Sequence, residues 1–341
     1  MRILVCGSSG CIGSAVVRAL RWRGHRVVET RRSVSADEVD AIAVDFERPS
    51  SVAAWATRLG SLDLDALVNC AGTALPGPVS ARADRLHGDG PSALFRGAAR
   101  ARVARIVNVS ALGDDGDEER ANRVRGGSRV GDRSDSLARS EDGWRSKPRT
   151  DDTLLGLDVD AVVVRPALVY GPGSRSAAAL SALARAPIQV LPRGAEALLQ
   201  PIHVFELVES IAALLERTGA ARGVYELSGG EVVSGRALIA TLRTAQGAAA
   251  PLVIASRLPL PLAHIAARWG PCASLGMANS DVLRFFDRRG LTRRNAAPVL
   301  LGRAPSTLAE GLLVTPPAPS AFRKPHRASP ARWLHHSRGV T

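Results

Sequence analysis

The chain has 341 residues, of which 45% are hydrophobic but only 4% aromatic, so its core must be built mainly from Ala, Val, Leu and Ile. The formal net charge is +13, and nearly all of the basic residues are arginine, which together with abundant Ala and Gly is typical of a GC-rich coding bias. The basic residues are scattered, with no stripe interleaved with aromatics, so we predict no nucleic-acid partner.

Cysteine and histidine usage argues against a disulfide-stabilised protein and against a metal-binding one. Four cysteines do not make a disulfide framework at this length, and no CxxC or histidine cluster indicates a metal site. No run of 18 apolar residues is present, so we expect no membrane span. These features predict a cytoplasmic protein without a metal.

Over the first 171 residues, short apolar runs alternate with helical patterns. Strands are expected at 2–6, 25–30, 41–46, 65–72, 105–113 and 160–171, and helices at 12–23, 50–59 and about 90–101. This alternation predicts right-handed crossovers and a parallel sheet covered on both faces. The fold class is therefore α/β, a Rossmann-type doubly wound parallel sheet.

The pattern changes after residue 171. Helices are expected at 174–186, 205–217, 235–246, 258–270 and 279–290, with short strands at 188–192, 200–204 and 224–230. Ser234 is placed to cap the third of these helices. We therefore predict one domain over 1–172 and a smaller, mostly helical C-terminal lobe over 173–315, packed on it.

Two segments have no apolar periodicity. Residues 114–146 mix acidic and basic residues, and 316–341 form a basic, Pro-rich tail. Their composition cannot bury enough apolar area to offset chain entropy. We predict that 114–146 is a low-complexity insertion and that 316–341 is a disordered tail. The composition of both segments is also what a shifted reading frame in a GC-rich gene would produce.

A glycine-rich loop joins the first strand to the first helix. It reads Gly7-Ser8-Ser9-Gly10-Cys11-Ile12-Gly13. Such a turn lets the backbone approach a pyrophosphate, and the helix N-terminus adds free N–H groups and a positive dipole end. We expect Gly7, Ser9, Gly10, Cys11, Ile12 and Gly13 to bind a dinucleotide, so 1–172 is an NAD(P)-binding domain.

The end of the second strand selects the dinucleotide. An acid there would bind the adenosine ribose, but the chain has Arg31 and Arg32, which suit a 2′-phosphate. Glu29 could still take the ribose role. The residues therefore favour NADP, with NAD as the alternative.

The next two strands end in further candidates for the adenosine half. Asp45 and Phe46 end the third strand, and Asn69, Ala71 and Gly72 end the fourth. Open α/β sheets bind ligands at the carboxyl ends of their strands, where these residues are expected to lie.

The ordered set of motifs resembles the short-chain dehydrogenase/reductase superfamily in its extended and atypical branches. GSSGCIG resembles the GxxGxxG loop, and DF, NCAG, VNVSALG, RPALVYGPG and QPIHV follow in the expected order. The segment LPLPLAHIAARWGP further resembles epimerase-like members and those similar to the complex I accessory subunit. The resemblance implies an NAD(P)-dependent oxidoreductase or sugar-nucleotide epimerase.

The resemblance also implies a Ser–Tyr–Lys catalytic set. Ser110 matches the serine and Lys147 the lysine, because RSK precedes a helical pattern. The tyrosine should stand four residues earlier, but that position is Gly143, and the two tyrosines of the chain lie in other motifs. Pro166, in the RPALVYGP segment, matches a position that closes over the nicotinamide end.

Two functions remain open from the sequence. One is an NAD(P)-dependent oxidoreductase or epimerase, impaired by the missing tyrosine, that acts on a small molecule in the cleft between sheet and lobe. The other is a non-catalytic NAD(P)H sensor or assembly protein. A homo-oligomer or a complex partner is compatible with both.

Overall fold

A computed structural model shows how the chain folds. It describes residues 1–35, 38, 40–48, 50–72, 84–112, 146–191, 196–249, 252–255 and 290–314. The predicted helix at 258–270 and all but the last residue of the one at 279–290 lie outside these ranges. The same holds for the segment 316–341 and for 114–146, of which only Ser146 is described.

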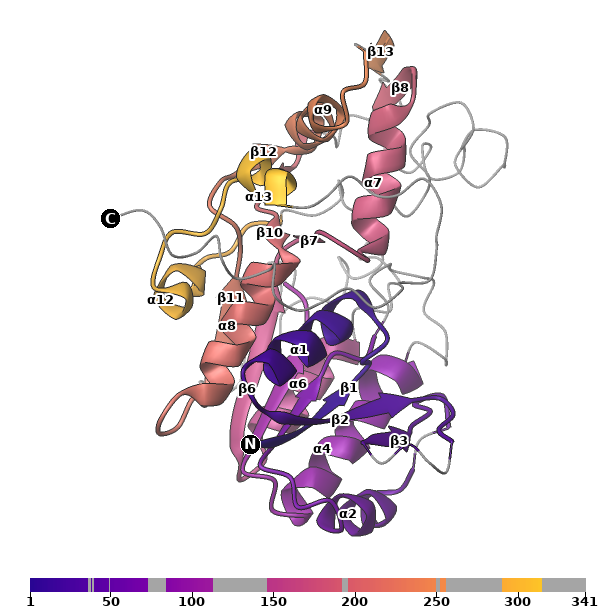
Figure 1. Ribbon diagram of the computed structural model, residues 1–341, viewed down its shortest axis with the longest axis vertical. Coiled ribbons are helices and arrows are strands. Elements are labelled where there is room, and N and C mark those ends of the chain that lie inside the picture. Colours follow the sequence, from indigo (N-terminus) through magenta and orange to yellow (C-terminus); the bar gives the residue numbers. More distant parts are fainter. Residues whose placement is uncertain are drawn as a thin grey trace, which may run out of the picture.

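Seven parallel strands form the central sheet, in the order β11-β6-β5-β4-β1-β2-β3 (Figure 1). They are β1 (Arg2–Cys6), β2 (Arg26–Arg31), β3 (Ala41–Ala43), β4 (Ala66–Asn69), β5 (Arg105–Val109), β6 (Asp160–Pro166) and β11 (Gly223–Leu227). The chain reverses its direction of travel across the sheet between β1 and β4, as in a doubly wound fold. The predicted Rossmann-type class is confirmed.

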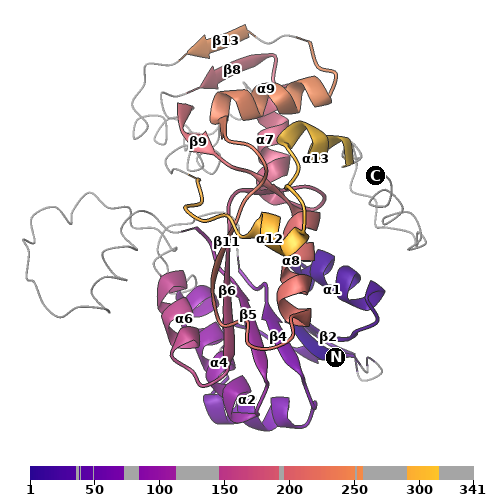
Figure 2. The same cartoon turned by 90° about the vertical axis from the view of Figure 1, so that its left-hand side faces the viewer.

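Helices cover both faces of this sheet. Helices α1 (Cys11–Trp22) and α8 (Val204–Glu216) lie on one face, and α2 (Val52–Gly60), α4 (Gly90–Arg100) and α6 (Ser146–Leu155) on the other (Figure 2). Strand β1 shows why both faces must be covered. Its alternate residues Ile3 and Val5 pack under α1 and α8, whereas Leu4 and Cys6 pack under α2 and α4. A strand apolar on both sides can be buried only between two layers.

A second, smaller body lies beyond the carboxyl ends of the strands (Figure 1). Its core joins α7 (Arg175–Arg185), α9 (Gly235–Ala245) and α13 (Leu308–Val314). Three strand pairs accompany them: β7 (Val169–Tyr170) with β10 (Ile202–His203), β9 (Leu198–Leu199) with β12 (Val233–Ser234), and β8 (Ile188–Leu191) with β13 (Leu252–Ala255). Ser234 caps α9 as predicted, accepting from the Ala237 N–H at 3.1 Å.

The predicted strand over 160–171 is wrong in one respect, because it is two strands. β6 ends at Pro166, and β7 leaves the large sheet to pair with β10. Proline has no N–H to donate to a ladder, so a strand ends readily there. The third strand is also shorter than predicted, 41–43 in place of 41–46.

The predicted division into 1–172 and 173–315 stays a prediction. Helix α8 and strand β11 come after residue 172 in the sequence. Nevertheless, α8 covers the large sheet, and β11 is the outermost strand of that sheet, beside β6. Helix α12 (Ala297–Leu301) packs on α8 in turn. The chain therefore returns to the Rossmann layers after it has entered the second body.

Candidate functional site

The glycine loop is a tight turn between β1 and α1. Gly7 has a φ of +70°, and a Cβ placed on it would lie 2.7 Å from the Ala71 nitrogen. A Cβ on Gly13 would lie 2.1 Å from the Gly7 oxygen. Both glycines are therefore required by the fold itself, because their backbone touches other backbone.

Gly10 differs from these two glycines. Its φ of −77° and ψ of 169° suit any residue, and a Cβ would meet only the Gly7 oxygen, at 3.3 Å. Gly10 is exposed and is the N-cap of α1, where no side chain caps the helix. A side chain at residue 10 would therefore fill the space beside the loop at the start of α1. The loop fits the phosphates of a dinucleotide, because the first N–H groups of a helix have no partner within the helix.

The loop is tied to the neighbouring strand by contacts that the sequence did not indicate. The Gly7 N–H donates to the Thr30 hydroxyl at 3.1 Å, and the Ser8 hydroxyl donates to the Thr30 carbonyl at 2.8 Å. The Cys11 thiol donates to the Pro172 carbonyl at 3.3 Å, and burial raises the pKa of Cys11 to about 11. Cys11 is therefore a neutral packing group. Among the other predicted members, Ser9 is exposed and Ile12 is partly buried against the core.

The arginines that end β2 are exposed. Arg31 lies 3.1 Å from the Glu38 carboxylate and 3.8 Å from that of Glu29. Arg21 holds the other Glu29 oxygen at 2.9 Å. Arg32 forms no ion pair with any residue in the described ranges. Glu29 is thus neutralised by two arginines, which weakens its case as a ribose acceptor.

The ends of β3 and β4 place the remaining cofactor candidates. Asp45 is exposed, while the ring of Phe46 is buried against Trp55, with centroids 6.4 Å apart. Any contact of Phe46 with a ligand would therefore use its backbone. After β4, Ala71 is partly buried and Gly72 is exposed.

A buried polar network lies where β5 and β6 meet α6. Asp151, which is 1% exposed, accepts from Ser110 Oγ at 2.9 Å and from Asn108 Nδ2 at 2.9 Å. Arg165 lies 3.1 Å from the same carboxylate. Asn108 in turn accepts from Asn69 Nδ2 at 2.9 Å. The predicted Ser110 and Asn69 thus belong to one chain of hydrogen bonds.

The sequence reading missed the centre of this network. Burial raises the pKa of Asp151, against the lowering effect of Arg165 and of the hydrogen bonds from Ser110 and Asn108. The signal was available, because Asp151 stands four residues after Lys147, one helical turn along α6. It was overlooked because the family pattern directs attention to the turn before the lysine.

The other members of the expected catalytic set are placed less fully. Lys147 lies in the first turn of α6, as its position before a helical pattern predicts, and Gly143 lies outside the described residues. Tyr225 donates to the Ala221 carbonyl at 2.9 Å. Tyr170 packs edge-on against His203, and burial raises its pKa. Neither tyrosine is placed to serve beside Ser110.

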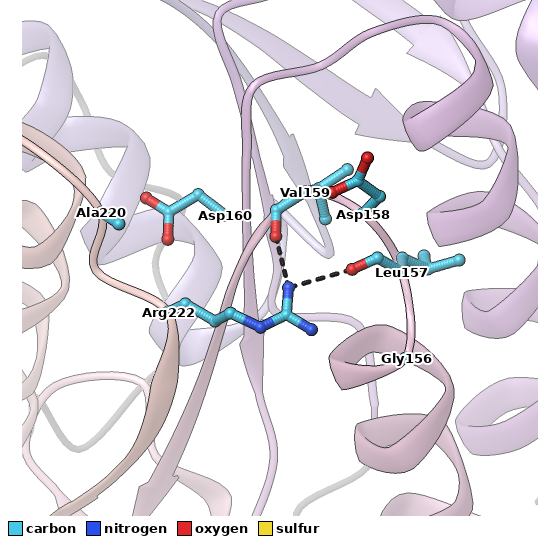
Figure 3. Close-up of a pocket in the computed structure, with 7 residues that line it drawn as sticks. All are labelled: Gly156, Leu157, Asp158, Val159, Asp160, Ala220 and Arg222. Carbon is cyan, nitrogen blue, oxygen red and sulfur yellow. Dashed lines mark hydrogen bonds between the residues drawn. The ribbon is translucent and has the colours of Figure 1, made fainter.

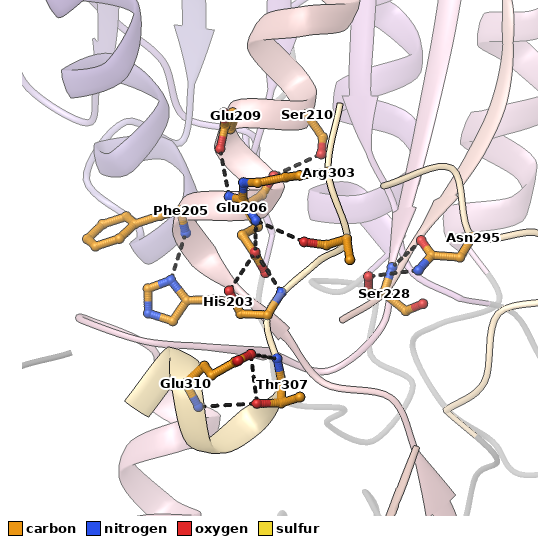
Figure 4. A network of polar contacts seen from close by, with 12 residues as sticks. His203, Phe205, Glu206, Glu209, Ser210, Ser228, Asn295, Arg303, Thr307 and Glu310 are labelled. Carbon is orange, nitrogen blue, oxygen red and sulfur yellow. Dashed lines mark hydrogen bonds and ion pairs between the residues drawn. The ribbon is translucent and has the colours of Figure 1, made fainter. Parts of the chain in front are cut away.

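The start of α8 forms a separate polar network (Figure 4). His203 Nδ1 accepts from the Phe205 N–H at 3.3 Å, and burial lowers the pKa of His203 to about 4. Glu206, 4% exposed, accepts from Arg303 at 2.7 Å and from the Ser306 N–H at 2.8 Å. These contacts fasten residues 303–306 to α8. The burial of His203 and Glu206 therefore has a structural explanation. The burial of Pro166 has one as well, because Pro166 lies in β6 opposite Leu227.

Two hollows differ in position. A shallow one of about 520 Å³ lies at the amino end of β6, beside the end of α6 (Figure 3). There Arg222 donates to the carbonyls of Leu157 at 2.9 Å and Val159 at 2.7 Å, so its guanidinium closes the helix end. The other, of only about 10 Å³, lies at the carboxyl ends of β4 and β5 beside Ser110. Its position matches the side where open α/β sheets bind ligands.

Two further properties follow from the described residues. They contain no group of three or more His, Cys, Asp or Glu that could hold a metal ion. Within the same ranges, every helix is too short or too polar to cross a bilayer.

The glycine loop and the strand order suggest a comparison with known dinucleotide-binding families. Residues 3–124 match the model of the NAD dependent epimerase/dehydratase family. The predicted resemblance is confirmed for this segment, which includes the glycine loop and Ser110. The resemblance to the complex I accessory subunit stays a prediction. No curated protein is matched by the sequence of this chain.

Solved structures share the fold over most of the chain. UDP-glucose 4-epimerase from Thermotoga maritima, solved with UDP-glucose, is 18% identical over 92% of this chain and 97% of its own, with a TM-score of 0.63. MoeE5 in complex with UDP-glucuronic acid and NAD is 20% identical over 92% and 97%, with a TM-score of 0.61. UDP-glucose 4-epimerase from Thermus thermophilus in complex with NAD is 19% identical over 84% and 99%, with a TM-score of 0.54. At these identities the likeness establishes the fold.

Proposed function

We propose that this protein binds NAD(P) in the cleft beside the glycine loop. The observation that carries the proposal is Gly10, whose backbone angles suit any residue and whose added Cβ would meet one atom, the Gly7 oxygen, in a tight contact at 3.3 Å. An exposed glycine at the start of a helix leaves room for a ligand to approach the backbone. Gly7, Ser9, Cys11, Ile12 and Gly13 complete the turn that would hold the phosphates.

The proposed dinucleotide is NADP, with NAD as the alternative. Glu29 is occupied by Arg21 and Arg31, whereas Arg32 is exposed beside them. A cluster with more arginines than acids favours a 2′-phosphate over a ribose hydroxyl. Several solved neighbours are complexes with NAD, which keeps NAD open for this chain. Asp45, the Phe46 backbone, Asn69, Ala71 and Gly72 would contact the adenosine half, and Pro166 the nicotinamide end.

The proposed chemistry is that of an NAD(P)-dependent oxidoreductase or of an epimerase acting on a sugar nucleotide. Neighbours of the same fold were solved with UDP-glucose or UDP-glucuronic acid, which supports a small polar substrate between sheet and lobe. When bound, the dinucleotide supplies or accepts a hydride. Ser110 and Lys147 would orient substrate and cofactor ribose. Gly143 stands at the tyrosine position, so we propose that turnover is impaired.

The alternative is a protein that senses NAD(P)H or assists assembly without turnover. The Ser110 network favours it to the extent that the hydroxyl hydrogen is already donated to Asp151. A cytoplasmic location and an oligomeric or complex partner belong to either proposal.

Calorimetry with NADPH and NADH tests dinucleotide binding. We expect the parent to bind NADPH, and Gly10→Leu to weaken binding by a hundredfold or more, about 3 kcal/mol, because the side chain fills the space beside the loop. Gly60→Leu is the matched control: Gly60 is exposed at the end of α2, with nothing within 4 Å of an added Cβ. Equal binding by parent and Gly10→Leu would contradict the proposal.

An activity assay separates the enzyme from the sensor. The parent is compared with a variant that combines Gly143→Tyr with a shortened 114–142 segment, using NADPH oxidation by a panel of carbonyl compounds. If the missing tyrosine limits turnover, the variant gains up to the roughly 10²–10⁴-fold that a positioned acid or base contributes. If neither protein turns over while both bind NADPH, the sensor is favoured.

A further inference from the structure

The proposed dinucleotide site has two separate anion-binding parts. The glycine loop would take the pyrophosphate, and Arg31 with Arg32 at the end of β2 would take the 2′-phosphate. In NADP these phosphate groups are joined through a single ribose, so the distance between them varies little. A site that uses both groups must therefore hold the loop and the strand end at a fixed separation.

Thr30 joins these two parts. It stands directly before Arg31, and its side-chain oxygen accepts from the Gly7 N–H at 3.1 Å while its carbonyl accepts from the Ser8 hydroxyl at 2.8 Å. Ser8 and Thr30 are only 3% and 6% exposed, so both side chains bond within the protein. The connection between loop and strand is thus made by hydrogen bonds that an incoming ligand does not have to displace.

The connection lies where β1 and β2 separate. The ladder between the two strands runs as far as Val5 opposite Glu29, and beyond it β1 turns into the glycine loop. On its other side β2 continues beside β3, because the Val44 N–H donates to the Arg31 carbonyl at 2.7 Å. Arg31 is therefore held toward β3, and the two bonds to Thr30 tie the loop to the same strand end.

The end of β4 limits the loop from the opposite side. Strands β4 and β2 flank β1, so the loop that continues β1 lies between their ends. A Cβ on Gly7 would lie 2.7 Å from the Ala71 nitrogen, which shows how closely the loop backbone contacts the end of β4. The position of the loop is thus set by contact with β4 on one side and by Thr30 on the other.

The two dinucleotides would use this arrangement unequally. NADPH would engage the loop with its pyrophosphate and the arginines with its 2′-phosphate. NADH has no 2′-phosphate and would engage the loop without that second contact. A change in the separation between the loop and Arg31 would therefore cost NADPH a charge-assisted hydrogen bond that NADH never makes.

We propose that Thr30 is the positioning residue that sets the preference of this site for NADPH over NADH. It holds the loop at the separation from Arg31 at which one ligand reaches both, and Ser8 is its partner in the loop. The inference rests on the proposed dinucleotide binding and deepens it, because it names a residue that determines which dinucleotide is bound.

Calorimetry with NADPH and NADH on the full-length protein tests the inference. Thr30→Val keeps the branched shape of the side chain and removes its oxygen, Thr30→Ser keeps the oxygen, and Ser8→Ala removes the second bond without altering Thr30. Thr244→Val is the matched control, because the exposed Thr244 hydroxyl donates to the Ala240 carbonyl at 3.1 Å within α9. Thr30→Val is also combined with Arg31→Ala to complete a double-mutant cycle.

We expect Thr30→Val and Ser8→Ala each to weaken NADPH binding by roughly tenfold and NADH binding by no more than about twofold. Thr30→Ser and Thr244→Val should bind both dinucleotides as the parent does. In the Arg31→Ala protein, Thr30→Val should weaken NADPH binding by no more than about twofold further, since the contact that Thr30 positions is already gone.

Equal weakening of NADPH and NADH by Thr30→Val would overturn the inference, because Thr30 would then support the loop without setting the preference. Unchanged binding in Thr30→Val, multiplying losses from Thr30→Val and Arg31→Ala, or a parent that binds both dinucleotides equally would overturn it as well. All of these results leave NAD(P) binding itself standing. If Thr30→Val does not fold, Ser8→Ala decides by the same criteria. A parent that binds neither dinucleotide would overturn the proposed function, and this inference with it.

Discussion

The glycine loop and the Ser110 network lie at the same edge of the sheet but differ in how far their polar groups are hydrogen-bonded within the protein. At the loop, the N-terminus of α1 has no side-chain cap and Gly10 is exposed. In the network, Asp151 is fully buried and accepts from Ser110, Asn108 and Arg165. The loop uses part of its donors within the protein but leaves the start of α1 without a side-chain cap, whereas the network satisfies its buried side chains among themselves.

This difference separates two kinds of evidence for function. The first N–H groups of a helix have no partner within the helix, so an exposed helix end without a side-chain cap is available to an anionic ligand. A satisfied buried network has a structural reason of its own, which is to join β5, β6 and α6.

Removal of the central carboxylate should have the largest effect on stability. We expect Asp151→Ala to lower the free energy of unfolding by about 3–5 kcal/mol, because it leaves Arg165, Ser110 and Asn108 without their acceptor. Chemical denaturation measures this value. The adjacent Asp152 is exposed, and Asp152→Ala should stay within about 0.5 kcal/mol of the parent. Similar losses in the two variants would show that the network is not the stabilising unit described.

Acid should weaken the network at the start of α8. The pKa of His203 is about 4 in the folded protein and ordinarily 6.5, so the unfolded chain binds the proton first as the pH falls. The contribution is complete above pH 6.5 and is lost between pH 6.5 and 4, on the order of 3 kcal/mol at 1.36 kcal/mol per pKa unit. Between pH 6.5 and 4, the free energy of unfolding should depend less on pH in His203→Gln than in the parent. A parallel pH dependence in both proteins would exclude His203 as the cause.

The proposed arginine cluster should affect only one dinucleotide. We expect Arg31→Ala to weaken NADPH binding by roughly tenfold, about 1.4 kcal/mol, through loss of a charge-assisted contact. NADH binding should be unchanged. Arg26→Ala, which removes an exposed arginine paired with Asp40 at 3.3 Å, serves as the control. Equal weakening of NADPH and NADH by Arg31→Ala would argue against a 2′-phosphate contact.

The smallest stability effect is expected at the residue that matters most for binding. Gly10→Leu should change the free energy of unfolding by no more than about 0.5–1 kcal/mol, because its backbone angles are ordinary and the added Cβ would meet only the Gly7 oxygen, at 3.3 Å. Gly13→Ala, whose Cβ would lie 2.1 Å from the Gly7 oxygen, should destabilise by about 1–3 kcal/mol or more. A large loss in Gly10→Leu would mean that the loop is glycine-rich for folding alone.

Much of the cofactor half follows from local sequence. Apolar runs that end in glycine or small residues predicted β1, β4 and β5, and periodic patterns predicted α1 and α4, because the apolar pattern that each element buries is visible in a short window. The strand break at Pro166 was missed, since a window over 160–171 reads as one apolar run. The short pair β9 and β12 gave no pattern long enough to detect.

Local patterns in the chain predict the fold class, the position of the glycine loop and the absence of a tyrosine four residues before Lys147. The folded structure adds three facts: Gly10 is exposed while Gly7 and Gly13 are enclosed by backbone, Asp151 meets Ser110, and His87 lines the hollow beside Ser110. These facts could not be predicted because they depend on residues far apart in the sequence. These contacts join residues from β4, β5, α6 and the π-helical turn η1 (Arg85–Asp89), and which side chains meet there depends on register, helix rotation and that single turn, which no local pattern encodes.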